Sequence, residues 1–77
     1  MLHAYVLIET EVGKVAHVAH AISSLDGVQV AEDLAGPYDV IAKVQASGLD
    51  ELGKLVVFGI QVQDGVTRTV TCTVIHR

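Results

Sequence analysis

Hydrophobic residues along the chain follow two different spacings. From residue 2 to residue 10 strand-forming residues predominate, and alternate residues fall on the same face of an extended strand. One face of this first strand carries Leu2, Ala4, Val6 and Ile8, and the other carries His3, Tyr5 and Leu7. Because both faces are largely apolar, we expect both to be covered in the folded protein.

Between about residues 13 and 25 the spacing becomes helical. Apolar residues recur every three or four positions and form one stripe along a helix: Val15, Val18, Ala19, Ile22 and Leu25. Asp26-Gly27 ends this helix, because glycine readily adopts the backbone conformation of a helix end.

Two strands follow, over residues 28–35 and 39–46, and Gly36-Pro37 is expected to form a tight turn between them. Strands this close in sequence pair as an antiparallel hairpin. The second strand of the hairpin has two distinct faces, with Val40, Ala42 and Val44 on one and Ile41 and Lys43 on the other.

A second helix and a last strand complete the pattern. Ser47 is expected to cap the helix, followed by acidic residues in the first turn and by an apolar stripe of Leu49, Leu52, Val56 and Gly59 or Ile60. Asp64-Gly65 ends this region, and the last strand spans residues 66–75. Its helix-facing side would carry Val66, Val70, Cys72 and Val74, and its opposite side Thr67, Thr69, Thr71, Thr73 and Ile75.

The predicted order is therefore β-α-β-β-α-β in a single domain, residues 1–77. The tripeptide Asp-Gly-Val occurs at 26–28 and again 38 residues later at 64–66, each time between a helix and a strand. Two βαβ halves with right-handed crossovers produce an α+β, ferredoxin-like sandwich, in which a four-stranded antiparallel sheet carries both helices on one face.

The other face of this sheet would carry Tyr5, Leu7, Ile41, Ile75 and the threonine row. A 77-residue domain is marginally stable on its own, and 51% of these residues are hydrophobic. We therefore expect a second copy to cover this face in a twofold-symmetric dimer. The alternative is a monomer in which this face is exposed to water and the threonines are present only because they favour β-strands.

Charge and cysteine content exclude several classes of protein. Five Lys and Arg against nine Asp and Glu give a net charge of -4, which argues against nucleic-acid binding by this chain alone. The single cysteine excludes both a disulfide framework and a structural zinc module. The sequence shows neither a signal peptide nor a membrane-length apolar run, so we expect a cytoplasmic protein that does not contact membranes.

Few residues indicate catalysis or metal binding. His17 and His20 lie three positions apart on the polar side of the first helix, but no clear third ligand accompanies them, so we expect solvated histidines. Cys72 is expected to be a buried structural thiol rather than a nucleophile. Phosphate-loop spacing and a Ser-His-Asp pattern are also absent. The sequence predicts no enzyme, no metal site and no cofactor.

The most informative stretch is Gly36-Pro37-Tyr38-Asp39. A loop carboxylate beside an aromatic ring suits the amino group of a small molecule, whose own carboxylate would accept hydrogen bonds from the turn N–H groups. The alternative is structural: Gly-Pro makes the turn, Tyr38 packs at the end of the sheet and Asp39 caps backbone groups. Spacing alone leaves both interpretations open.

Together the motifs of this chain resemble the effector-binding domain of the Lrp/AsnC family, also called the RAM domain, across essentially all 77 residues. The turn is similar to the Gly-x-Tyr-Asp signature of that family, and residues 68–71 are similar to its Arg-Thr-x-Thr pattern. The remaining matched segments are Asp26-Gly27-Val28, Leu49-Asp50-Glu51-Leu52 and Asp64-Gly65-Val66.

The resemblance implies a domain that dimerises through its sheets, assembles into octamer- or decamer-like rings and binds amino acids or related small metabolites between dimers. The candidate ligand-binding residues that it implies are Gly36, Tyr38, Asp39, Thr69 and Thr71. Family members of full length place a helix-turn-helix domain before this one, whereas Met1 here starts almost directly at the first strand. The chain therefore looks like a stand-alone form, which would act on transcription through a DNA-binding relative or through metabolite sensing.

Two other protein classes share the β-α-β-β-α-β topology. A dimeric α+β barrel enzyme needs polar side chains that face inward, and the helix-facing rows here are almost wholly aliphatic. An ACT-like regulatory domain also binds amino acids, but it pairs its sheets edge to edge. The geometry of the dimer would separate the ACT-like arrangement from the Lrp/AsnC one.

Overall fold

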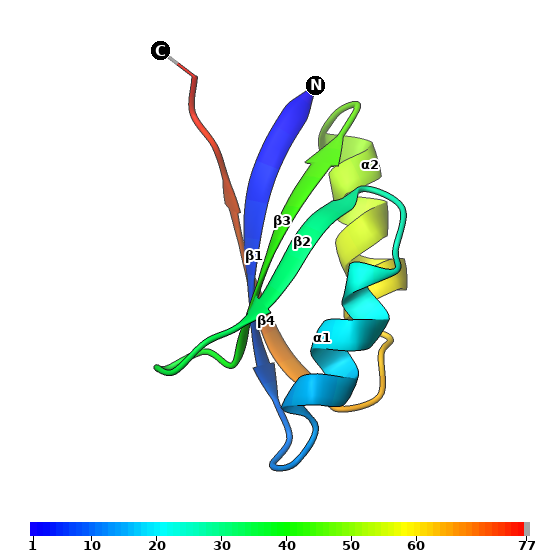
Figure 1. The fold of residues 1–77 in the computed structure, drawn as a ribbon. Coiled ribbons are helices and arrows are strands. Elements are labelled where there is room, and N and C mark those ends of the chain that lie inside the picture. The colour runs from blue at the N-terminus through cyan, green and yellow to red at the C-terminus, as the bar shows by residue number, and fades with distance from the viewer. Residues whose placement is uncertain (77) are drawn as a thin grey trace.

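The computed structural model describes residues 1–76 and confirms the predicted order of elements (Figure 1). The elements are β1 (Leu2–Thr10), α1 (Val15–Ser23), β2 (Val28–Asp33), β3 (Val40–Ala46), α2 (Leu49–Lys54), its π-helical continuation η1 (Leu55–Ile60) and β4 (Val66–Thr73). Within this part of the chain, no helix is long and apolar enough to cross a membrane.

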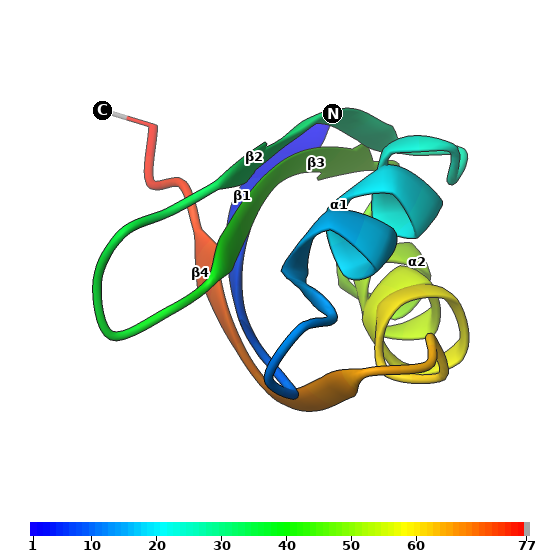
Figure 2. The same cartoon turned by 60° about the horizontal axis from the view of Figure 1, so that its bottom comes forward.

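The four strands form one antiparallel sheet in the order β2-β3-β1-β4. Both helices lie on the same side of the sheet, which curves around them (Figures 1 and 2). This arrangement confirms the predicted ferredoxin-like, α+β fold. It leaves the opposite side of the sheet, here called the outer face, without any helix over it.

The core fills the space between the sheet and the helices. Val18 and Ile22 of α1 are fully buried, which confirms the first helical stripe. The strands bury alternate residues, also as predicted: Ala4, Val6, Ile8, Val40, Ala42, Val44 and Ala46. Each fully buried Val, Leu or Ile side chain contributes roughly 1.5–3 kcal/mol of transfer free energy, so this layer is the main stabilising feature of the fold.

The start of the second helix differs from the prediction. Gly48 occupies the N-cap position and no side chain caps the helix, so the expected Ser47 cap is wrong. Leu49 also lies outside the core, with 71% of its surface exposed. The rest of the predicted stripe, Leu52, Val56 and Ile60, is buried as expected.

The hairpin loop is wider than predicted. β2 ends at Asp33 and β3 begins at Val40, so residues 34–39 connect them in place of a tight Gly36-Pro37 turn. The Leu34 N–H donates to the Asp39 carbonyl oxygen (2.8 Å) and closes the base of this loop.

The last strand has its two faces exchanged relative to the prediction. Glu9 pairs with Arg68 but Thr10 pairs with Val66, so Thr67 is an extra residue in β4 and forms a β-bulge. Beyond a bulge the alternation of side chains shifts by one position. The threonines of β4 therefore share the helix-facing side with the buried residues of β1, through the pairs Ile8–Thr69, Val6–Thr71 and Ala4–Thr73.

The same shift places Cys72 on the outer face, opposite Tyr5. Cys72 is exposed, so its prediction as a buried thiol is wrong. The outer face has an apolar centre of Tyr5, Leu7, Val30, Ile41 and Val70, interrupted by Lys43 and rimmed by Glu9, Glu32 and Arg68. Tyr5, Leu7 and Ile41 lie there as predicted, whereas the threonine row does not.

Candidate ligand-binding site

The β2–β3 loop projects beyond the sheet, away from the helices (Figure 2). Gly36 and Pro37 at its tip are exposed, and Tyr38 and Asp39 are half-buried where the chain returns to β3. The tip is accordingly free to meet another molecule, while the base is fixed against the sheet.

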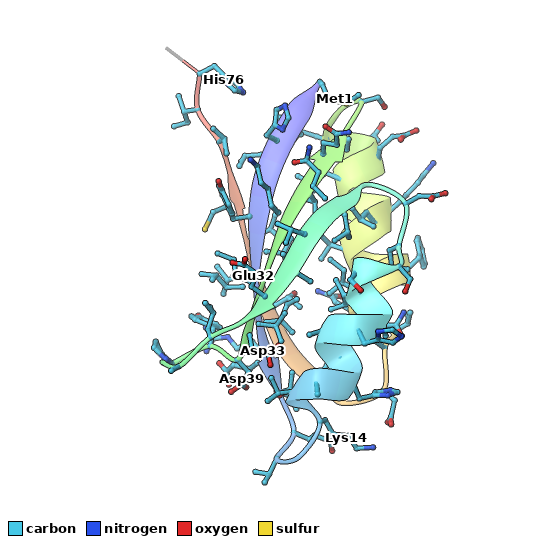
Figure 3. The ribbon with its side chains drawn as sticks, viewed as in Figure 1. Met1, Lys14, Glu32, Asp33, Asp39 and His76 are labelled. Atoms are coloured by element: carbon cyan, nitrogen blue, oxygen red, sulfur yellow. The ribbon has the colours of Figure 1, made fainter. Side chains whose placement is uncertain are left out.

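Asp39 attaches the loop to the end of β1. Its Oδ2 atom accepts hydrogen bonds from the Thr10 backbone N–H (2.8 Å) and from Thr10 Oγ1 (3.3 Å). Its own N–H donates to the Ile8 carbonyl oxygen (2.9 Å). Both side-chain bonds use Oδ2, so Oδ1 retains acceptor capacity for a ligand. Figure 3 shows Asp39 at the base of the loop, with Glu32 and Asp33 at the same end of the sheet.

Replacing Asp39 with alanine is expected to destabilise the fold by about 1–3 kcal/mol, because the partly buried Thr10 N–H loses its acceptor. Asp39→Asn keeps a side-chain oxygen and should lose less. Urea unfolding of the two variants measures the difference. Equal stability of the alanine and asparagine variants would contradict the structural role of this carboxylate.

The two candidate threonines lie on β4. Thr69 is half-buried, and its Oγ1 accepts a hydrogen bond from Gln61 Nε2 (2.9 Å). Thr71 is exposed, two residues further along the same side of the strand. Strand β4 lies at the edge of the sheet, beside β1 only, so these hydroxyls face an open space next to the helices.

A hollow of about 400 Å³ opens at the start of β4. It is lined by Gln61, Val66, Thr67, Arg68 and Thr69. Arg68 is the charged residue among them, and its Nη1 lies 3.7 Å from Glu9 Oε2. Gln61 was not predicted to belong to the site, because its contact with Thr69 depends on the chain path after η1 and on the bulge at Thr67.

One chain does not bring all the predicted site residues together. The Asp39 backbone is hydrogen-bonded to Ile8 from the β3 side of β1, and Thr69 pairs with Ile8 from the β4 side. The strands that carry them flank β1, so their backbones lie about 10 Å apart. The hollow is lined by Thr69 but by none of Gly36, Tyr38 and Asp39.

The other chemically reactive residues form no such site. His17 and His20 are exposed, and the rings of His3 and His76 pack edge to face with their centroids 5.9 Å apart. Among residues 1–76 no three His, Cys, Asp or Glu side chains are placed to hold one metal ion. Within residues 1–76 the buried core contains no polar or charged side chain.

Comparison with known proteins identifies the family. The model of the Lrp/AsnC ligand binding domain matches residues 3–77. The crystal structure of the protein TTHA0845 from Thermus thermophilus superposes with a TM-score of 0.95 at 34% sequence identity, covering 100% of this chain and 96% of that one.

Two further relatives are longer than this chain. An uncharacterised helix-turn-helix-type transcriptional regulator of Pyrococcus furiosus is 37% identical over 54 residues, which are 70% of this chain and 36% of the regulator. A Neisseria meningitidis transcriptional regulator, solved as a complex with L-methionine, shares the fold at a TM-score of 0.85 and 16% identity; the match covers 97% of this chain and 50% of that one. The chain thus spans about a third of the length of the curated relatives it matches, which are named as transcriptional regulators. From its fold and from the family match over nearly its whole length, the chain belongs to the Lrp/AsnC ligand-binding domain family.

Proposed function

We propose that this chain is an oligomeric domain that binds an amino acid or a related small metabolite, and that the binding site is complete only where copies meet. The observation that carries the proposal is the separation of the candidate residues. The loop residues Gly36, Tyr38 and Asp39 lie on one side of β1, and Thr69 and Thr71 lie on the other. A projecting loop of one copy could reach the hollow of another, whereas it does not line its own.

The outer face supports the assembly part of the proposal. Tyr5 on the central strand β1 and Val30 on the edge strand β2 remain 39% and 44% exposed on the outer face. A stable dimer buries about 800 Å² from each partner, which is roughly a sixth of the 4781 Å² surface of this chain. A second copy packed face to face would cover the apolar centre, and further dimer contacts would build a ring.

The family supports the ligand part. A relative with the same fold was solved with L-methionine, an amino acid of the class that the loop and threonines suit. A ligand carboxylate can accept hydrogen bonds from threonine hydroxyls, and an amino group can donate to Asp39. These 77 residues are acidic and carry no basic cluster for DNA, so they would affect transcription through a DNA-binding domain, whichever chain carries it.

A thermal-shift panel of the standard amino acids tests the ligand. A ligand present at 100 times its Kd stabilises the protein by about 2.7 kcal/mol, which raises the Tm of a domain this small by roughly 10 °C or more. Thr71→Val serves as the matched variant, since it removes an exposed hydroxyl at constant shape and should abolish the response. If no amino acid or related metabolite shifts the Tm of the assembled protein, the proposed function is wrong.

A further inference from the structure

The strands place two acidic and two basic side chains on the outer face: Glu9, Glu32, Lys43 and Arg68. Glu9 and Arg68 are partners within one chain, with Arg68 Nη1 3.7 Å from Glu9 Oε2. Glu32 and Lys43 remain, and neither forms an ion pair with any of residues 1–76. The outer face of one chain thus carries one unpaired anion and one unpaired cation.

Lys43 is surrounded by apolar side chains. It lies on β3 between Tyr5 of β1 and Val30 of β2, and Ile41 is the next residue on the same side of its strand. In the single chain Lys43 is exposed to water. A second copy packed on this face would remove much of that water, and a buried charge without a partner strongly opposes association. A face-to-face dimer therefore needs an anion opposite Lys43.

Glu32 is the acid on the same face that has no partner of its own. It lies on the edge strand β2, opposite Ile41, and is exposed where β2 approaches the loop (Figure 3). Glu32 and Lys43 are diagonal neighbours in the sheet, a position in which the backbones are roughly 7–8 Å apart. In a twofold-symmetric dimer every contact is made twice, so Lys43 against the partner's Glu32 brings Glu32 against the partner's Lys43.

We propose that Lys43 and Glu32 form reciprocal ion pairs across a face-to-face dimer, and that these pairs set the alignment of the two sheets. The inference rests on the assembly part of the proposed function and names the contacts that make it specific. Hydrophobic contact is not directional, so an apolar sheet face alone allows many alignments. A charge among apolar residues allows only those alignments that give it a partner. Since β2 ends one residue after Glu32, the alignment also decides where the two β2–β3 loops project.

Charge reversal, measured by light scattering and circular dichroism, tests the pairs. Lys43→Glu brings two carboxylates together at each contact, and Glu32→Lys brings two ammonium groups together. Either variant should raise the Kd of the dimer by roughly 100-fold or more, because the symmetry doubles the repulsion, and should leave monomers. Lys54→Glu and Asp50→Lys are the matched controls, because they make the same changes on α2 and should keep the parental mass.

Mixing the two variants identifies the partner of Lys43. In a heterodimer of Lys43→Glu with Glu32→Lys, both contacts join opposite charges, so an equimolar mixture should recover the parental mass. A pair formed within one chain could not be rescued in this way. Refolding the two variants together from urea extends the test to variants that fold only as dimers.

The outcomes separate this inference from the proposed function. A monomeric parent protein would overturn the proposed assembly and the ion pairs with it. An assembled parent whose mass is unchanged in both single variants would overturn the ion pairs alone. Single variants that dissociate but do not associate on mixing would show that Glu32 is not the partner of Lys43, which equally overturns the inference.

Discussion

Replacing Leu7 with aspartate is expected to convert the assembled protein into folded monomers. Leu7 lies at the centre of the outer face, between Ile41 of β3 and Val70 of β4. In a face-to-face dimer its side chain would be buried, and an unpaired carboxylate there costs several kcal/mol of desolvation. Within the chain Leu7 is half-buried and no helix covers it, so the same carboxylate keeps contact with water.

The measurement is the molar mass of Leu7→Asp by light scattering, together with its circular dichroism. A mass near 8.2 kDa with an unchanged spectrum is the expected result. His20→Asp is the control, because His20 is exposed on α1 and should leave the assembly intact. A Leu7→Asp protein that keeps the parental mass would show that the outer face is not the interface.

Replacing Gly65 with alanine is expected to cost about 2–5 kcal/mol of folding free energy, from backbone strain and from overpacking together. Gly65 has a φ of +99°, where residues with side chains are strained. A Cβ atom at this position would also lie 2.8 Å from Lys14 Cβ and 3.1 Å from Val18 Cγ2. A loss of this size lowers the Tm of so small a domain by roughly 10 °C or more.

The surroundings of Gly65 leave little room for the backbone to adjust. The Glu11 N–H donates to the Gly65 carbonyl oxygen (2.8 Å), and Lys14 Nζ binds Asp64 Oδ2 (2.9 Å). That hydrogen bond and the charge of Lys14 lower the pKa of the Asp64 carboxyl. Gly36→Ala is the matched control, since no atom lies within 4 Å of a Cβ there and its Tm should change little. Equal Tm values for the two variants would contradict the packing described around Gly65.

The sequence predicts the layers of the fold because each layer has a simple period. Alternation marks the buried sides of β1 and β3, and a three-to-four spacing marks α1, so these elements pack as expected. The second helix is harder to predict, because Leu49 fits the helical spacing yet is the first residue of α2 and remains exposed. Its π-helical continuation has no sequence pattern of its own.

One inserted residue explains the largest error. Val66 faces the core, and strict alternation from Val66 then assigns Cys72 to the core and the threonines to the outer face. The bulge at Thr67 reverses both assignments. A bulge depends on how β4 registers against β1, which local sequence does not encode.

The candidate site shows the same division between local and long-range information. The turn motif is local, so Asp39 could be selected from sequence, although its bonds to Thr10 join residues 29 positions apart. Gln61 has no motif, and only the three-dimensional path after η1 brings its amide to Thr69. Which copy supplies which residue is a property of the assembly rather than of one chain.

The central claim is that this domain functions as an assembly, with its outer face covered and its ligand site shared between copies. Light scattering coupled to size exclusion, at the concentration used for ligand binding, tests this claim most directly. The account predicts a molar mass of at least two chains, each of 8.2 kDa, and a multiple of the dimer where rings form. A single species of 8.2 kDa would contradict it.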